Sequence, residues 1–109
     1  IQHVTQYLNE KYGDGTVEAV VEDSYYNMKE KILPHMQIVE AAEEAMRKCG
    51  TEPVIVPIRG GTDGARLSYM GLPCPNLSTG GHNFHGKYEY IPAESMEVMT
   101  NVLVELVKC

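Results

Sequence analysis

The chain has 109 residues, 43% of them hydrophobic and 22% charged, a composition that argues against intrinsic disorder and suits one small domain. The net charge of −6 and the scattered basic residues argue against nucleic acid as a partner, because phosphate recognition needs clustered Lys and Arg. No run approaches the roughly 20 apolar residues that cross a bilayer, so we expect no membrane partner. The 3 cysteines form no CxxC motif, which favours reduced thiols in a cytoplasmic protein over a disulfide framework.

The N-terminal part predicts a helix followed by a strand. Ile1, Val4 and Leu8 recur at helical spacing, which predicts a helix over residues 1–12, and the glycines that follow end it. Residues 16–22 then alternate apolar and polar side chains, which is typical of a strand. Its outward-facing glutamates indicate a sheet with one solvent-exposed face.

A second helix is predicted after Pro34, with Gly50 in the position of a C-terminal cap. Its apolar stripe consists of Ile38, Val39, Ala42, Ala45, Met46 and Cys49. The short apolar run of residues 54–56, bounded by prolines, suits a buried strand of a parallel or mixed sheet.

The last predicted helix runs from about residue 93 to 107. Its inward-facing side chains are expected to be Met96, Met99, Val102, Leu103 and Leu106. Helices that alternate with buried strands predict an α/β fold. The predicted strand at residues 16–22 would belong to a sheet with one solvent-exposed face, and the run at residues 54–56 to a buried sheet. This difference indicates two domains that meet near residues 24–34.

The first candidate functional segment is the glycine-rich loop Arg-Gly-Gly-Thr-Asp-Gly at residues 59–64, directly after a predicted strand. Its glycines allow a close approach of the backbone to a ligand, and the amides of such a loop face an anion. Arg59 adds a two-pronged donor for a carboxylate. A tight turn with an exposed arginine explains the same spacing equally well.

The second segment is Ser-Thr-Gly-Gly-His-Asn-Phe-His-Gly at residues 78–86. Neutral imidazoles at His82 and His85 suit zinc, but zinc needs three or four ligands and no further histidine lies nearby. Asp63 and Glu89 are conceivable oxygen ligands. Either the two histidines are structural, or the remaining ligands come from outside this chain.

Four stretches, in order and with matching spacing, resemble the peptidase T family of bacterial tripeptide aminopeptidases, part of the aminoacylase and carboxypeptidase-like dizinc peptidase superfamily. They are Asp-Ser-Tyr-Tyr-Asn-Met at 23–28, Ile-Arg-Gly-Gly-Thr-Asp-Gly-Ala at 58–65, Gly-Leu-Pro-Cys-Pro-Asn-Leu at 71–77 and Thr-Gly-Gly-His-Asn-Phe-His-Gly at 79–86. The resemblance covers essentially all of the chain. Together with the absence of an initiator methionine, it leads us to expect the C-terminal part of a larger enzyme.

The resemblance implies a two-domain α/β architecture. Residues 1–27 would be the end of an inserted lid domain, a helix plus an edge strand. Residues 28–109 would be the C-terminal part of a zinc-exopeptidase-like catalytic domain, with a mostly parallel sheet flanked by helices. Half of a sheet leaves unpaired edges, so we expect the isolated fragment to form homo-oligomers.

The resemblance also implies site residues. A histidine at the position of His85 ligates one of two zinc ions in this family, whereas His82 falls at a variable position. The other ligands and the glutamate general base would lie upstream, so this chain would contain no catalytic residue and would be inactive alone. The substrate-binding residues implied for a tripeptide are Arg59, Gly60, Gly61, Thr62 and Asn83.

Three alternatives remain open. Within the same superfamily, the chain would belong to another exopeptidase or an amidohydrolase. From a different class, it would be a non-catalytic binding or dimerisation module, or a small-anion binder whose affinity depends on Arg59.

Overall fold

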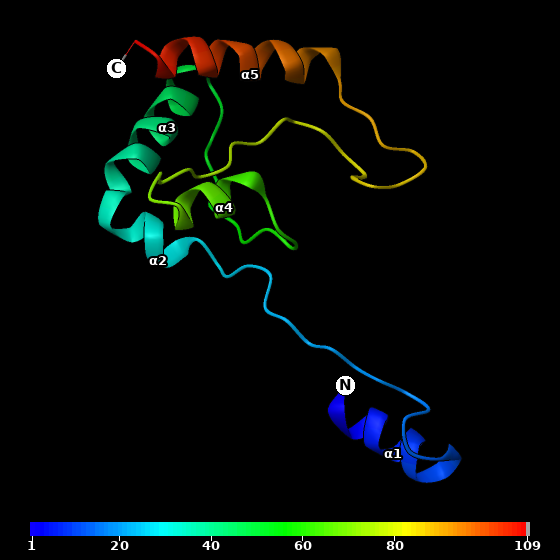
Figure 1. Ribbon diagram of the computed structural model, residues 1–109. Helices are drawn as coiled ribbons and strands as arrows, with labels where there is room; N and C mark the ends of the chain where they lie inside the picture. Colours follow the sequence, from blue (N-terminus) through cyan, green and yellow to red (C-terminus); the bar gives the residue numbers. More distant parts are fainter. Residues whose placement is uncertain (109) are drawn as a thin grey trace.

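The computed structural model describes residues 1–108, and its regular elements are helical (Figure 1). In chain order they are α1 (Gln2–Tyr12), α2 (Lys29–Ile32), the 3-10 turn η1 (Leu33–His35), α3 (Met36–Lys48), α4 (Asp63–Tyr69) and α5 (Ala93–Leu106). No helix in the described part of the chain is both long and apolar enough to cross a membrane.

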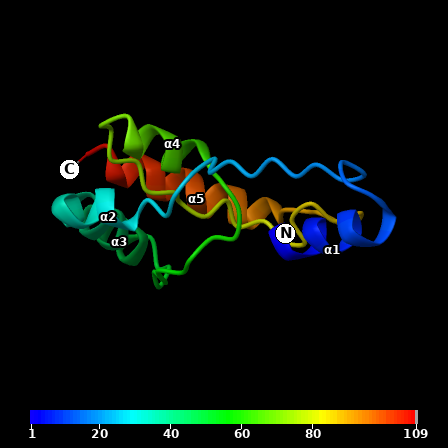
Figure 2. The same ribbon diagram turned by 60° about the horizontal axis from the view of Figure 1, so that its bottom comes forward.

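Helix α1 lies apart from the other helices, at the far end of a long extended segment (Figures 1 and 2). The whole molecule is elongated, with principal dimensions of 63 × 37 × 18 Å. Asn9 fixes the start of the extended segment, because its side chain exchanges hydrogen bonds of 2.9 and 2.8 Å with the backbone oxygen and nitrogen of Val17. The predicted N-terminal helix is confirmed, and it contains no buried residue.

The core lies where α3 packs against α5 (Figure 1). Ala45 on α3 and Val102 on α5 are fully buried, and Ala42 is nearly so. An ion pair of 3.5 Å between Lys48 and Glu105 also links the two helices. The small side chains of Ala42 and Ala45, which belong to the predicted apolar stripe of α3, allow the two helices to pack closely.

The amphipathic pattern of α3 is confirmed, and so is the role of Gly50. The stripe residues are all buried or half-buried. Gly50 follows the helix with φ of +75°, a conformation that glycine adopts without strain. On α5 the prediction is only partly right, since Met96 and Leu103 are 54% and 50% exposed.

Helix α4 is short, and its neighbours hold it at both ends. The hydroxyl of Thr62 caps its N-terminus by accepting a hydrogen bond of 3.1 Å from the amide of Ala65. Further along, buried Ser68 donates to the carbonyl of Gly64 at 2.7 Å and accepts from the amide of Cys74 at 3.0 Å. The Gly-Leu-Pro-Cys-Pro segment thereby packs directly against the helix.

The predicted α/β fold with a parallel sheet is wrong for the residues that the structure describes. Residues 16–22 and 54–56 are extended, yet neither segment has a hydrogen-bonded neighbour strand within residues 1–108. The three valine and isoleucine side chains of residues 54–56, expected to be buried, are 63–75% exposed. Alternating or apolar patterns show that a segment is suited to a sheet, but a sheet forms only where a second segment supplies the backbone partners.

One small β-feature is present. His82 and Tyr90 form an isolated antiparallel bridge, with hydrogen bonds of 2.8 and 3.2 Å between their backbones. The bridge closes the loop that contains His85. The expected division into a lid part at residues 1–27 and a catalytic part at residues 28–109 stays a prediction.

Candidate functional site

The glycine-rich loop of residues 59–62 leads into α4 and is shaped by three local features. Gly60 has φ of +102°, a conformation that disfavours any side chain. Gly61 lies against the ring of Tyr25, where an added Cβ would stand 2.8 Å from Cε1. The hydroxyl of Thr62, besides capping α4, accepts a hydrogen bond of 3.1 Å from the side-chain amide of Asn76.

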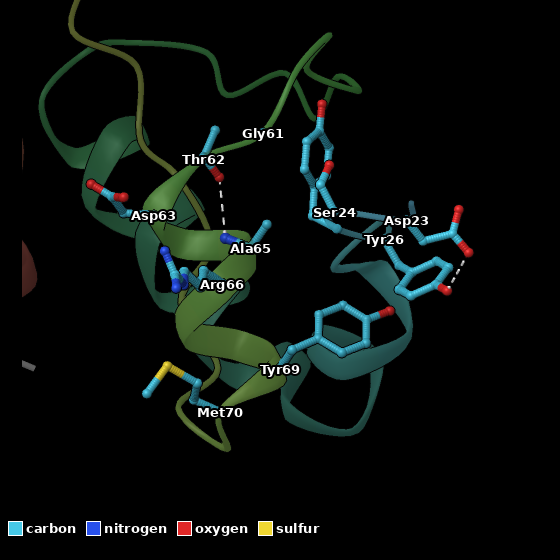
Figure 3. A pocket seen from close by; sticks show the side chains of 11 residues that line it. Asp23, Ser24, Tyr26, Gly61, Thr62, Asp63, Ala65, Arg66, Tyr69 and Met70 are labelled. Atoms are coloured by element: carbon cyan, nitrogen blue, oxygen red, sulfur yellow. Dashed lines mark hydrogen bonds between the residues drawn. The ribbon is translucent and has the colours of Figure 1, made fainter. Parts of the chain in front are cut away.

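An open pocket of about 890 Å³ lies between this loop, α4 and the segment of residues 23–26 (Figure 3). It is lined by Asp23, Ser24, Tyr25, Tyr26, Gly61, Thr62, Asp63, Ala65, Arg66, Tyr69 and Met70. Segments more than 30 residues apart in sequence therefore meet here, as they do in ligand sites that are made of several short stretches.

Tyr69 joins the two sides of the pocket. Its hydroxyl lies 2.8 Å from Oε1 of Glu30 and 3.1 Å from the carbonyl oxygen of Asn27. Its ring lies 6.1 Å from the ring of Tyr26, and the ammonium group of Lys31 lies 5.0 Å above it. Partial burial raises the pKa of Tyr69, and the hydrogen bond to Glu30 and its negative charge raise that pKa further.

The loop of residues 82–86 is the most strained part of the backbone. Asn83 and His85 have φ of 55° and 63°, in the left-handed region that few non-glycine residues adopt. Two bonds hold this conformation: the amide of His85 donates to Oε2 of Glu89 at 2.9 Å, and the side chain of Asn83 donates to the carbonyl of Tyr88 at 3.2 Å. Strain of this kind is frequent where a side chain must be aimed at a ligand.

His82 and His85 differ in their surroundings. The ring of His82 stacks on that of Tyr90 with a centroid distance of 5.1 Å, which gives it a structural role in closing the loop. His85 is exposed, and its backbone rather than its imidazole contacts Glu89. His85 and Glu89, two of the conceivable metal ligands, are therefore neighbours, but their contact joins the Glu89 carboxylate to the backbone of His85 and not to its imidazole.

The sequence model of peptidase family M20/M25/M40 matches residues 3–108. The chain belongs to this family. The resemblance to peptidase T that its motifs suggested is confirmed by individual relatives in this peptidase family. The peptidase T of Caldanaerobacter subterraneus subsp. tengcongensis is 63% identical over 108 residues, covering 99% of this chain and 26% of the relative.

Two further relatives agree with this assignment. The peptidase T of Alkaliphilus oremlandii is 60% identical over 99% of the chain and 26% of its own length. The peptidase T of Clostridium perfringens is 60% identical over 96% of the chain, again across 26% of the relative. The chain thus spans about a quarter of the length of these curated relatives of the M20/M25/M40 family.

The structure brings together only some of the residues predicted for a functional site. Gly61 and Thr62 line the pocket, whereas Arg59, Gly60, Asn83 and His85 lie outside its lining. Within residues 1–108, no group of three or more His, Cys, Asp or Glu side chains is arranged to hold a metal ion. The predicted roles of all six residues stay predictions.

Sequence reasoning missed the pocket itself. No binding role was predicted for Tyr25, Tyr26 or Tyr69. The available signal was the pair of tyrosines that breaks the alternation of the strand-like segment. Nothing in the sequence alone indicated that this pair would face α4, because the contact joins residues about 40 positions apart, as the Tyr69 hydrogen bond to Asn27 does with a separation of 42.

Proposed function

We propose that this chain is part of a cytoplasmic, zinc-dependent tripeptide aminopeptidase, which releases the N-terminal residue of tripeptides. The observation that carries the proposal is the 63% identity to a peptidase T across 99% of the chain. Because the chain spans about a quarter of that relative, the isolated chain is proposed to be inactive.

His85 is the proposed metal ligand. Its neutral imidazole is a suitable donor for zinc, and the strained, exposed position of the residue at the tip of a closed loop suits a side chain aimed away from its own segment. One imidazole is too few for a zinc site, so the remaining ligands and the general base would come from the rest of the protein. A bound zinc ion would supply Lewis acidity and an activated water for amide hydrolysis.

The residues of the 59–62 loop are proposed to bind the peptide. Arg59 is exposed and offers a planar pair of donors to a carboxylate or an oxyanion. Gly60 leaves open space for the substrate backbone, Gly61 would contact the peptide through its main chain, and Thr62 is held in place by its bonds to Ala65 and Asn76. Asn83, with its side chain fixed on the carbonyl of Tyr88, would hold the loop of His85 in shape or contact the peptide.

The test is kinetics of the full-length protein with His85→Gly beside His82→Gly. Glycine relaxes the left-handed backbone at position 85, so the lost imidazole rather than new strain accounts for the result. We expect kcat/KM for a tripeptide to fall by at least about 100-fold for His85→Gly, more than outer residues of a metal site contribute. Activity of His85→Gly within a few-fold of the wild type would contradict the proposal, whatever His82→Gly does.

Homo-oligomers of the isolated chain are proposed as well. Val54, Ile55 and Val56 are 75%, 68% and 63% exposed in consecutive positions, and their extended backbone can pair with another chain. Analytical ultracentrifugation of the isolated chain should show species larger than a monomer. The double change Val54→Lys/Val56→Lys should shift them toward the monomer, and a wild-type chain that stays monomeric at high concentration would refute the proposal.

A further inference from the structure

The pocket between α4 and the segment of residues 23–26 adjoins the loop proposed to bind the peptide. Gly61 and Thr62 belong both to that loop and to the lining of the pocket. A peptide bound along the loop would therefore have one of its side chains next to the pocket mouth. The inference below rests on the proposed function and deepens it.

The pocket walls present aromatic faces. Tyr25 and Tyr26 come from the extended segment and Tyr69 from α4, and Figure 3 shows the rings of Tyr26 and Tyr69 close beside each other, with ring centroids 6.1 Å apart. The ring of Tyr25 covers Gly61, where any Cβ would meet it at 2.8 Å. Rings of this kind contribute large apolar surface at small loss of conformational freedom.

Two of the three tyrosine hydroxyls are already bonded within the protein. Tyr26 donates to Oδ2 of Asp23 at 2.9 Å, and Tyr69 lies 2.8 Å from Oε1 of Glu30. These bonds hold the two rings in place, and the ring of Tyr69 also contacts the Lys31 ammonium and the ring of Tyr26. The ring surface open to a ligand is therefore mainly that of Tyr25 and Tyr26, which are 53% and 58% exposed. The pocket is thus suited to an apolar or aromatic group.

The charges of the lining disfavour an acidic ligand. Asp23 and Asp63 contribute two carboxylates, whereas Arg66 contributes one guanidinium. A third carboxylate brought into this partly enclosed site would meet net negative charge and lose water of hydration.

We propose that this pocket accepts one side chain of the peptide, and that Tyr25 makes it selective for bulky apolar or aromatic side chains over acidic ones. Tyr25 is the specificity-determining residue, because it touches both the substrate loop at Gly61 and the interior of the pocket. Loss of the Tyr25 side chain would widen the pocket next to the bound peptide.

The experiment is steady-state hydrolysis by the full-length protein of three sets of tripeptides, each with one position varied among Ala, Phe and Glu. One position should show the order Phe, Ala, Glu in kcat/KM. At that position Tyr25→Ala should lower the Phe-to-Ala ratio of kcat/KM by roughly 10-fold, the usual range for an apolar pocket that loses a wall. Tyr7→Ala on α1, a tyrosine of similar exposure, should leave the ratio unchanged.

If tripeptides are cleaved but no position changes its Phe-to-Ala ratio by more than about 2-fold in Tyr25→Ala, the inference is wrong and the proposed function stands. If the wild type cleaves none of the peptides, the proposed function fails and the inference with it. Should Tyr25→Ala not fold, Gly61→Ala provides the same test, because its Cβ would stand 2.8 Å from the Tyr25 ring, displace that ring from its present position and so also lower the ratio.

Discussion

Ala45 and Val102 are fully buried where helices α3 and α5 pack together. By contrast, Arg59, Asn83 and His85, which are predicted to contact a ligand, are exposed in loops. The helix pair satisfies its backbone hydrogen bonds within each helix and its apolar stripes against each other. The non-helical segments, residues 13–28 and 51–62, have no paired strand among residues 1–108 that would satisfy their backbone hydrogen bonds in the same way. The chain therefore defines its helical packing more completely than the arrangement of its extended segments.

The largest expected effect breaks the helix pair. Val102→Asp places a charge without a partner in a fully buried position, and such a group destabilises by about 3 kcal/mol or more. Chemical denaturation of the 109-residue chain, followed by its helical circular dichroism, should show lost helicity or a much earlier transition. The matched control is Val104→Asp on the same helix, whose side chain is 48% exposed. Equal effects of the two changes would mean that α3 and α5 do not pack as described.

An intermediate effect concerns the start of α4, beside the pocket. Thr62→Ala removes the hydroxyl that caps Ala65 and accepts from Asn76, which should destabilise this helix by about 1 kcal/mol. Hydrogen exchange at the amide of Ala65 should accelerate accordingly. Thr62→Ser keeps the oxygen and should preserve the protection of that amide, so faster exchange in both variants would contradict the cap.

The smallest expected effect is a pH dependence of the stability of the helix pair, which arises from Glu105 on α5. The hydrogen bond to Lys108 and the charges of Lys108 and Lys48 lower the pKa of Glu105 below its ordinary range. The carboxylate therefore contributes stability above the pKa of the unfolded chain, and this contribution is lost as pH falls through the lowered folded value.

Glu105→Gln should consequently flatten the acid limb of a plot of melting temperature against pH and change little near neutrality. Glu97→Gln on the same helix serves as the control. An acid limb of unchanged slope in Glu105→Gln would show that this exposed group of charges contributes nothing measurable, as is frequent for surface ion pairs.

The sequence was sufficient for the features whose causes are local. The helices at residues 1–12, after Pro34 and near the C-terminus follow from apolar spacing, and Gly50 ends its helix as its lack of a Cβ allows. It was insufficient for the sheet, since the apolar run at residues 54–56 carries no information about which segment would pair with it. The family was readable because four motifs stand in order.

The candidate site shows the same division. The glycines of this loop were identified from loop chemistry and Thr62 from the family resemblance, and their surroundings agree with a constrained loop. The aromatic walls were missed, because Tyr25 gains its meaning only from contact with Gly61, 36 positions later. His85 could be singled out from its motif, but its left-handed backbone depends on Glu89 and could be read only from coordinates.

We propose that the metal site is divided between this chain and the rest of the protein, with His85 as the ligand that residues 1–108 contribute. Calorimetric titration of the 109-residue chain with Zn²⁺, beside His85→Ala, tests it most directly. We predict no binding tighter than roughly tens of micromolar, since a single imidazole holds zinc weakly. Tight stoichiometric binding that disappears in His85→Ala would show that the chain, or an oligomer of it, builds a complete metal site by itself, and would contradict the account.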